Sequence, residues 1–441
     1  MARQTNAVLH LLLPVIFFAG IYFINSNGCI SYLWTLLLFL ITNFLLDKNY
    51  RTRNFYAFHF FLFLAIIMYF GNLQHDPTQL GLTGGVGITD DTAYFAAASD
   101  THYSNITISG HATRDSFWIQ LIRFLYPFKI IDPINIIILN VFMGLSFLPY
   151  LTAKISEELF HDKKIASYAF LLITFCPFCW QGGLIIMRDV PTLILILTAF
   201  YNFLKKRYLL VAGAVTLLIL IKMGFIVFLI IPVACYIISR TGKGLTLSKV
   251  LLTLLIVIGT VAFYLFIIPN LSAITGGKMT DDDIFRSNFL GFLQRSNEES
   301  LLVKIYGYPI IVRIPLLILA FLTIPMLKFS FGYTAGIGFI PRYVLMVGIY
   351  PIYIMIFSRY IFNTVAFKYK ERNVKMMMTI VVLIALALGM VSLQVRHKVV
   401  LMPFLYMLAA YGMVKCPKIA MGRLYQIIFI IANLVYATIT S

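Results

Sequence analysis

Long apolar stretches, separated by short polar linkers, recur along the whole chain of 441 residues. Most are close to the length of a helix that crosses a bilayer, which needs roughly 20 apolar residues. Because a backbone in lipid must satisfy its own hydrogen bonds, each stretch is expected to be a helix. The sequence therefore predicts an all-α polytopic membrane protein with about 12–14 transmembrane helices. The predicted spans are 7–24, 30–46, 54–71, 133–151, 166–187, 190–204, 208–221, 223–239, 249–268, 308–327, 333–357, 376–394, 399–414 and 421–439.

Basic linkers orient these spans. Three short linkers, at 47–53, 205–207 and 240–249, are rich in lysine and arginine, and loops of this kind stay in the cytoplasm. A cytoplasmic N-terminus places all three on the cytoplasmic side when the spans are counted in order. The basic stretch 359–375 does not fit this orientation. Its charge favours the cytoplasm, whereas counting the spans in order places it on the outer side. A re-entrant or broken segment in the glycine-rich stretch 332–341 would restore agreement.

The same count places two long loops outside, 72–132 with six acidic residues and 269–307 with five. Loops of this length in a compact protein are usually functional or disordered. Within the first loop, 116–128 is amphipathic, and we expect a helix there that lies in the membrane interface. No composition shift marks a soluble domain, so 1–441 is predicted to be a single membrane domain.

Composition sharpens the choice of protein class. Hydrophobic residues make up 61% of the chain and charged residues 12%, whereas soluble domains carry roughly a quarter charged residues. A net charge of +18 would suggest nucleic acid as the partner of a soluble protein. In a membrane chain it reflects cytoplasmic basic linkers, so we expect membrane lipids and no nucleic acid as partners. Cys176 and Cys179 have redox spacing, but their apolar setting favours packing.

Acidic residues outside the predicted spans are the first candidates for chemistry. Asp90 and Asp91 precede a segment of small residues that includes Tyr94. They either cap a helix or act as a general base or as ligands of a divalent cation such as Mg²⁺ or Mn²⁺. Arg188 and Asp189 lie between two apolar runs. A charged pair there is either a structural ion pair or part of a functional site.

Cations at the predicted outer surface are the second set of candidates. Lys222 interrupts an apolar run of 32 residues, 208–239. A turn at Lys222 predicts a helical hairpin whose lysine either extends to the headgroups or binds a lipid phosphate. Arg396, His397 and Lys398 form a basic run between two spans. The run is either a topological anchor or a phosphate site, with His397 as a possible proton carrier.

Several of these segments together resemble the membrane glycosyltransferases of the C-type fold. That family includes protein mannosyltransferases and lipid A aminoarabinose transferases, which use polyprenyl-phosphate sugars. One difference is the Asp-Asp pair, because protein mannosyltransferases carry Asp-Glu there. The four matching pieces are Asp90 to Phe95, Met187 to Leu193, Ala212-Gly213 through Lys222 to Pro232, and Arg396 through Pro403 to Gly412.

The resemblance implies a bacterial inner-membrane glycosyltransferase whose active site faces the periplasm, where loops 72–132 and 269–307 would lie. It would transfer a sugar or glycan from a polyprenyl-phosphate-linked donor to a lipid-linked or polysaccharide acceptor, as in lipopolysaccharide and O-antigen biosynthesis. Asp91, or Asp90, would be the general base, and Asp189 would share that role or orient the acceptor. The residues expected to bind the substrate and its phosphate are Arg188, Lys222, Arg396, Lys398, His397 and Tyr94.

Two alternatives remain open at this point. An O-antigen or capsule polymerase also has about a dozen spans and a large external loop, and Arg286 and Arg295 would then matter more than Asp91. A lipid-linked oligosaccharide flippase or another transporter needs ionisable residues within several spans. Most acidic residues of this chain fall in loops instead, which favours an enzyme.

Overall fold

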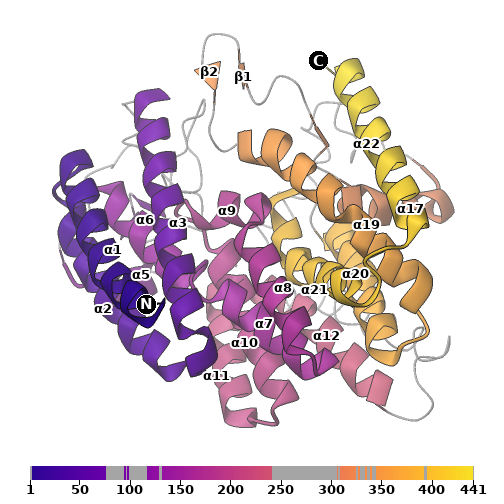
Figure 1. Ribbon diagram of the computed structural model, residues 1–441, viewed down its shortest axis with the longest axis horizontal. Coiled ribbons are helices and arrows are strands. Elements are labelled where there is room, and N and C mark those ends of the chain that lie inside the picture. Colours follow the sequence, from indigo (N-terminus) through magenta and orange to yellow (C-terminus); the bar gives the residue numbers. More distant parts are fainter. Residues whose placement is uncertain are drawn as a thin grey trace, which may run out of the picture. The chain divides into compact units, whose positions relative to one another are not determined.

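A computed structural model gives the fold (Figure 1). Helices make up almost all of it, and two short strands, β1 (Tyr333–Thr334) and β2 (Gly338–Phe339), pair antiparallel. The residues that the structure describes are 2–75, 94–95, 97–98, 117–128, 132–240, 305, 308–323, 326–327, 333–334, 338–339, 344–391 and 395–440.

The helices follow the apolar stretches of the sequence. Their bounds in chain order are α1 (Ala2–Ile24), α2 (Gly28–Leu45), α3 (Lys48–His75), α5 (Phe117–Leu125), α6 (Pro133–Met143), α7 (Leu148–Phe160), α8 (Lys163–Thr174), α9 (Pro177–Gly183), α10 (Asp189–Leu204), α11 (Tyr208–Lys222), the 3-10 helix η3 (Met223–Phe225), α12 (Ile226–Arg240), α17 (Ile310–Thr323), the π-helix η5 (Val344–Ile349), α19 (Tyr350–Lys368), α20 (Arg372–Val391), the 3-10 helix η6 (Val395–Leu401), α21 (Met402–Lys415) and α22 (Ala420–Thr440).

Six helical stretches in the described part of the chain are long and apolar enough to cross a membrane. The chain is therefore an all-α, multi-pass membrane protein, as the sequence predicts. The predicted span 249–268 lies outside the described residues. The six stretches are Gly28–Leu45, Lys48–Gln74, Pro133–Phe160, Tyr208–Arg240, Arg396–Lys415 and Ala420–Thr438, and two shorter apolar helices cover His10–Ile24 and Asp189–Leu204.

Within the membrane domain, the contacts between residues distinguish two compact units. Each unit is discontinuous in sequence, because the chain passes between them more than once. Unit 1 comprises Met1–Tyr150, Thr174–Ile194 and Lys328–Ile349, and unit 2 comprises Leu151–Ile173, Leu195–Leu327 and Tyr350–Ser441.

Unit 1 is built around α6. Helices α1, α2 and α3 lie side by side (Figure 1), and α2 and α3 both pack on α6. Every residue of α6 from Pro133 to Phe142 is buried, as expected for a helix that is apolar on all sides. The amide of Asn140 on α6 donates to the carbonyl oxygens of Gly183 (3.3 Å) and Ile185 (2.6 Å). These bonds fix the turn that precedes α10.

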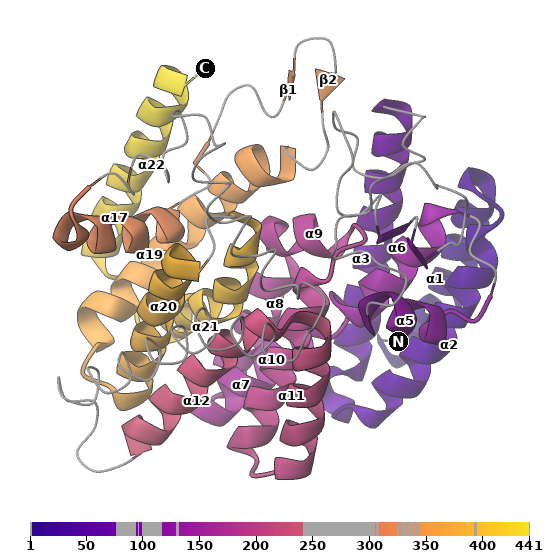
Figure 2. The same ribbon diagram turned by 180° about the vertical axis from the view of Figure 1, so that it is seen from behind.

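Unit 2 contains the predicted helical hairpin (Figure 2). Helix α11 ends at Lys222, one 3-10 turn follows, and α12 begins at Ile226. The ring of Phe203 contacts both Tyr208 at the start of α11 (6.5 Å between centroids) and Tyr236 near the end of α12 (6.0 Å). A continuous helix would separate these tyrosines by about 42 Å. The chain therefore reverses direction at Lys222, which confirms the predicted turn.

Three predicted spans are not continuous helices. The span 133–151 is divided between α6 and α7, and the span 333–357 contains β1 and β2 before η5 and α19. The stretch 166–187 forms two helices, α8 and α9, because the chain turns at Cys176 and Pro177. Cys176 is extended and Pro177 opens α9, since proline lacks an amide hydrogen and disfavours helical backbone at the preceding residue. Cys176 and Cys179 are free and fully buried, in keeping with a packing role.

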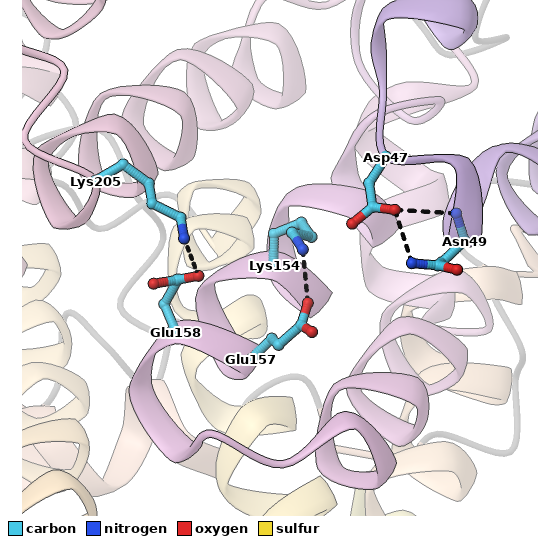
Figure 3. A network of polar contacts seen from close by, with 6 residues as sticks. All are labelled: Asp47, Asn49, Lys154, Glu157, Glu158 and Lys205. Carbon is cyan, nitrogen blue, oxygen red and sulfur yellow. Dashed lines mark hydrogen bonds and ion pairs between the residues drawn. The ribbon is translucent and has the colours of Figure 1, made fainter.

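Polar contacts gather at one end of unit 2. Lys205 forms an ion pair with Glu158, as Figure 3 shows, and Lys415 pairs with Asp162 at 2.9 Å. The amide of Asn373 donates to the carbonyl of Leu159. The basic stretch 359–375 therefore lies at the same end of unit 2 as the linker 205–207, which the sequence predicts to be cytoplasmic. We refer to this end as the basic end.

The ion pairs at the basic end stabilise the fold only weakly, but they show which linkers lie together. In the Lys415–Asp162 pair, the lysine ammonium holds the pKa of the Asp162 carboxyl below its ordinary value. Its stabilising effect is therefore present above the unfolded pKa of about 4 and is lost as the pH falls through the lower folded value. An exposed pair of this kind is worth less than about 1 kcal/mol. The pairs show which linkers lie together at one end of unit 2.

Cysteine labelling tests this orientation. We expect a membrane-impermeant maleimide, added to intact spheroplasts, to label Gly224→Cys but neither Lys206→Cys nor Lys370→Cys. Positions 206 and 370 are exposed at the basic end and 224 lies in the turn after α11. All three should react once the membrane is broken. The five native cysteines are buried and set the background. Labelling of position 370 without position 206 in intact spheroplasts would refute the shared side.

Candidate functional site

In unit 1, two arginines hold the segment that follows the acidic pair. Asp90 and Asp91 themselves lie outside the described residues. The Tyr94 side chain is buried, and the Arg188 guanidinium carbon lies 6.0 Å from the centre of its ring. Arg123 on α5 donates to the carbonyl oxygen of Ala97 through Nη2 (2.8 Å) and to that of Ala98 through Nε (3.3 Å). The structure thus brings together two predicted residues, Tyr94 and Arg188.

Asp189 is the first residue of α10 and is 3% exposed. A carboxylate there interacts favourably with the helix dipole. The preceding carbonyl, of Arg188, accepts from both the Oγ1 (2.5 Å) and the backbone amide (2.9 Å) of Thr192. The charged pair therefore sits at a well-ordered helix start. Both of its predicted roles, structural and functional, are compatible with this position.

Arg123 was not singled out by the sequence analysis. It lies in α5, which forms within the predicted amphipathic segment 116–128 and buries Trp118, Ile119 and Ile122. A single charged residue in a nine-residue, mostly apolar helix was the available signal. Its carbonyl partners could not be predicted, because they lie about 25 residues earlier in the chain.

In unit 2, Lys222 meets His397, 175 residues further along the chain. The Lys222 Nζ lies 3.1 Å from the His397 Nε2 and 3.9 Å from the centre of the Phe225 ring. The Phe225 ring in turn stands perpendicular to the His397 imidazole, with 5.2 Å between centroids. His397 is 4% exposed. We call these two residues the Lys222–His397 pair.

Two further cations flank the pair on η6. The Lys398 side chain is fully buried, with Nζ 5.2 Å from the centre of the Tyr350 ring. Arg396 is half-buried. Cation–aromatic contacts of this kind offset part of the cost of taking an ammonium out of water. With Lys222 and His397 they form the basic cluster, defined as Lys222, Arg396, His397 and Lys398.

The basic cluster lies at the end of unit 2 away from the basic end. Helix α11 runs from the basic linker 205–207 to Lys222, and α21 runs from η6 to Lys415, which bonds Asp162. Each helix spans about 21–23 Å. The cluster therefore lies at the opposite end of unit 2 from the linker 205–207.

A single hydrogen lies between the Lys222 Nζ and the His397 Nε2, which are 3.1 Å apart, and either nitrogen can be its donor.

Metal ligands were predicted only as a possibility, at Asp90 and Asp91, which lie outside the described residues. Within the residues that the structure describes, no three His, Cys, Asp or Glu side chains gather in a group that could hold a metal ion. Phe225 and Tyr350 were missed by the sequence analysis. Phe225 follows Lys222 by three residues, which was a usable signal, whereas Tyr350 had none.

Searches against protein-family models, curated proteins and solved structures gave no match for this chain.

Proposed function

We propose that the protein is a bacterial inner-membrane glycosyltransferase. It transfers a sugar or glycan from a polyprenyl-phosphate-linked donor to a lipid-linked or polysaccharide acceptor on the periplasmic side. The observation that supports this most is the basic cluster, which gathers three lysine or arginine side chains and a histidine at the end of unit 2 opposite the basic end. Intramembrane and near-membrane cations are costly and mark sites of function.

A phosphate leaving group explains the composition of the cluster. When a glycosyl bond to a lipid phosphate breaks, negative charge accumulates on the phosphate oxygens. Pre-placed cations in a site of low dielectric stabilise this charge, and such electrostatic stabilisation is usually the largest single contribution to catalysis. Lys222 and Arg396 are half-buried, so both can reach a headgroup whose lipid chain remains in the bilayer.

The acceptor hydroxyl needs a base, and Asp91, with Asp90 as the alternative, takes this role in the proposal. The carbonyl contacts of Arg123 and the stacking of Arg188 on Tyr94 hold the segment that follows these residues. Asp189 shares the role of base or orients the acceptor. Mg²⁺ or Mn²⁺ would have Asp90 and Asp91 as ligands, and no step of the proposal depends on it.

Replacing Lys222 by methionine tests the role of the cluster. Methionine keeps the length and apolar stem of the side chain but removes the charge. We expect the rate of transfer to fall about 100-fold, the size of effect seen when one preorganised donor is removed. The measurement is surface glycan, together with lipid-linked intermediates extracted from the same cells.

Lys418→Met is the matched control, because Lys418 is an exposed lysine that follows α21 at the basic end. Loss of glycan in Lys222→Met alone, with accumulation of a lipid-linked single sugar, is the expected result. Accumulation of complete repeat units would identify a polymerase instead. Normal glycan in Lys222→Met would remove the main support for the proposal.

A further inference from the structure

Helix α5 has three different sides, although it is only nine residues long. Its buried side comprises Trp118, Ile119 and Ile122. With about 100° between successive residues, Gln120 and Arg123 share a second, polar side. The third side is apolar and accessible, because Phe117 and Leu121 are half-buried and Phe124 is 80% exposed. A helix between protein and water needs only two kinds of side, so the third indicates a second, apolar solvent.

A hydrogen bond to α2 fixes the height of α5 in unit 1 (Figure 2). The indole Nε1 of Trp34 donates to the carbonyl oxygen of Leu125, the last residue of α5, at 2.7 Å. Helix α2 has 18 residues, or about 27 Å, which is close to the thickness of the hydrocarbon core. Trp34 lies about 9 Å along its axis from Gly28. Helix α5 therefore ends just inside one end of a membrane-length helix.

Polar side chains mark the water side of this level. Asn27, in the turn before α2, donates to the Oδ2 of Asp132 at 2.6 Å. Asp132 directly precedes α6, and the Ser31 hydroxyl donates to the carbonyl oxygen of Asn135 at 2.9 Å. Helices α2 and α6 thus begin at the same height, beside a polar layer.

Aromatic side chains follow on the inner side of the polar layer. The ring of Phe128 stands edge-on to Trp34 (5.8 Å between centroids) and to Tyr126 (5.5 Å). Tryptophan and tyrosine are enriched where headgroups meet acyl chains. The order of polar and aromatic side chains therefore places α5 at this boundary.

The lipid-facing side of α2 continues to the end of α5. Ile30 and Leu33 are 57% and 52% exposed on α2, a helix long and apolar enough to cross the membrane. Trp34 follows Leu33 and contacts Phe128, which is 44% exposed. A protein partner would need about 800 Å² of surface, more than one side of a nine-residue helix provides. Acyl chains have no such requirement.

We propose that α5 is a lipid anchor that ties the segment containing Ala97 and Ala98 to the bilayer surface. Phe124 enters the boundary between headgroups and acyl chains, where helices of this kind lie about 5–10 Å deep. On the polar side, Arg123 donates to the carbonyl oxygens of Ala97 and Ala98. The partner of the apolar side is therefore lipid, and the polar side holds the segment.

Nitroxide labels on the full-length protein in liposomes of phosphatidylethanolamine and phosphatidylglycerol test the lipid contact. Phe124→Cys and Gln120→Cys place the label on the apolar and the polar side of the same helix, and the five native cysteines are buried. Oxygen, which concentrates among acyl chains, and a nickel chelate, which stays in water, compete for collision with the label. We expect the label at 124 to favour oxygen and the label at 120 to favour nickel.

Two results at position 124 would overturn the lipid contact. A label that favours nickel would show that this side faces water. A label that collides with neither agent would show that protein covers it.

Hydrogen exchange at Ala97 and Ala98, in the same liposomes, tests the tie to the segment. Phe124→Asp removes the anchor, and we expect exchange to rise about tenfold, the lower end of the effect of withdrawing a phenylalanine from an apolar setting. Arg123→Gln removes the charged donor of both carbonyl contacts and should also raise exchange about tenfold. Gln120→Asp is the matched control, since it adds the same charge on the polar side, and should change nothing.

The two variants can fail separately. Equal exchange in Phe124→Asp and Gln120→Asp would refute the anchor, and unchanged exchange in Arg123→Gln would refute the tie. Exchange in α2 and α6 should stay at the wild-type rate in all three variants, which shows that unit 1 remains folded. Neither test requires a sugar donor, so both results stand apart from the proposed function.

Discussion

Replacing Gly412 by alanine is expected to destabilise the protein by about 2–3 kcal/mol, the upper part of the range for overpacking a close-packed interior. Helices α19 and α21 cross at this glycine. A Cβ there would overlap the backbone carbonyl oxygen of Tyr360 and lie 2.6 Å from the Thr364 Oγ1. Because the obstacle is backbone, the clash cannot be relieved by a rotamer change. The two helices would have to separate.

Separation would also break the polar contact between the helices. The Thr364 hydroxyl donates either across the crossing to the carbonyl oxygen of Leu408 or within α19 to the carbonyl oxygen of Tyr360, each at 2.9 Å. Alanine gains at most about 1 kcal/mol over glycine in helix propensity. The steric cost therefore dominates. Small residues at helix crossings, which let backbones approach closely, are a general device of membrane proteins.

Gly213→Ala is the matched control, since it makes the same substitution in α11 with nothing within 4 Å of the added Cβ. It should leave stability unchanged or raise it by up to about 1 kcal/mol. Thermal unfolding in detergent, followed with a thiol-reactive dye, measures both variants because all five cysteines are buried in the folded chain. A Gly412→Ala protein as stable as Gly213→Ala would contradict the packing described.

The positions of helices and turns were predictable from the sequence where a local signal exists. Lys222 in an apolar run of 32 residues predicted the hairpin between α11 and α12, and the Phe203 contacts confirm it. The amphipathic pattern of 116–128 likewise predicted a helix where α5 forms. Such signals succeed because the backbone in lipid has few alternatives to a helix. Hydropathy alone missed the turn at Pro177, since both sides of it are equally apolar.

The candidate site was harder to assemble from the sequence. Lys222 and His397 were both named, but nothing local shows that they share a hydrogen bond across 175 residues. The side of the basic stretch 359–375 was also undecided, because span counting fails where a span boundary is ambiguous. The bond from Asn373 to Leu159 places it at the basic end. Residues that meet only through tertiary packing leave no pattern in the sequence that would reveal their contact.

Asp91→Asn is expected to slow sugar transfer about 10²–10⁴-fold, the range for loss of a general base. Asparagine preserves size and polarity but cannot accept the acceptor's proton. Donor binding should change little, because the proposal assigns the phosphate to the basic cluster. Asp162→Asn, the same substitution at a half-buried carboxylate of the basic end, should transfer sugar at the wild-type rate.

The most direct measurement follows a sugar-labelled polyprenyl phosphate lipid through purified protein in proteoliposomes. We expect wild-type protein to move the label from the lipid to an acceptor and to leave polyprenyl phosphate behind, and Asp91→Asn to slow this transfer at least about 100-fold while still binding the lipid. Label that crosses the bilayer still attached to its lipid, or equal transfer by Asp91→Asn and wild type, would contradict this expectation.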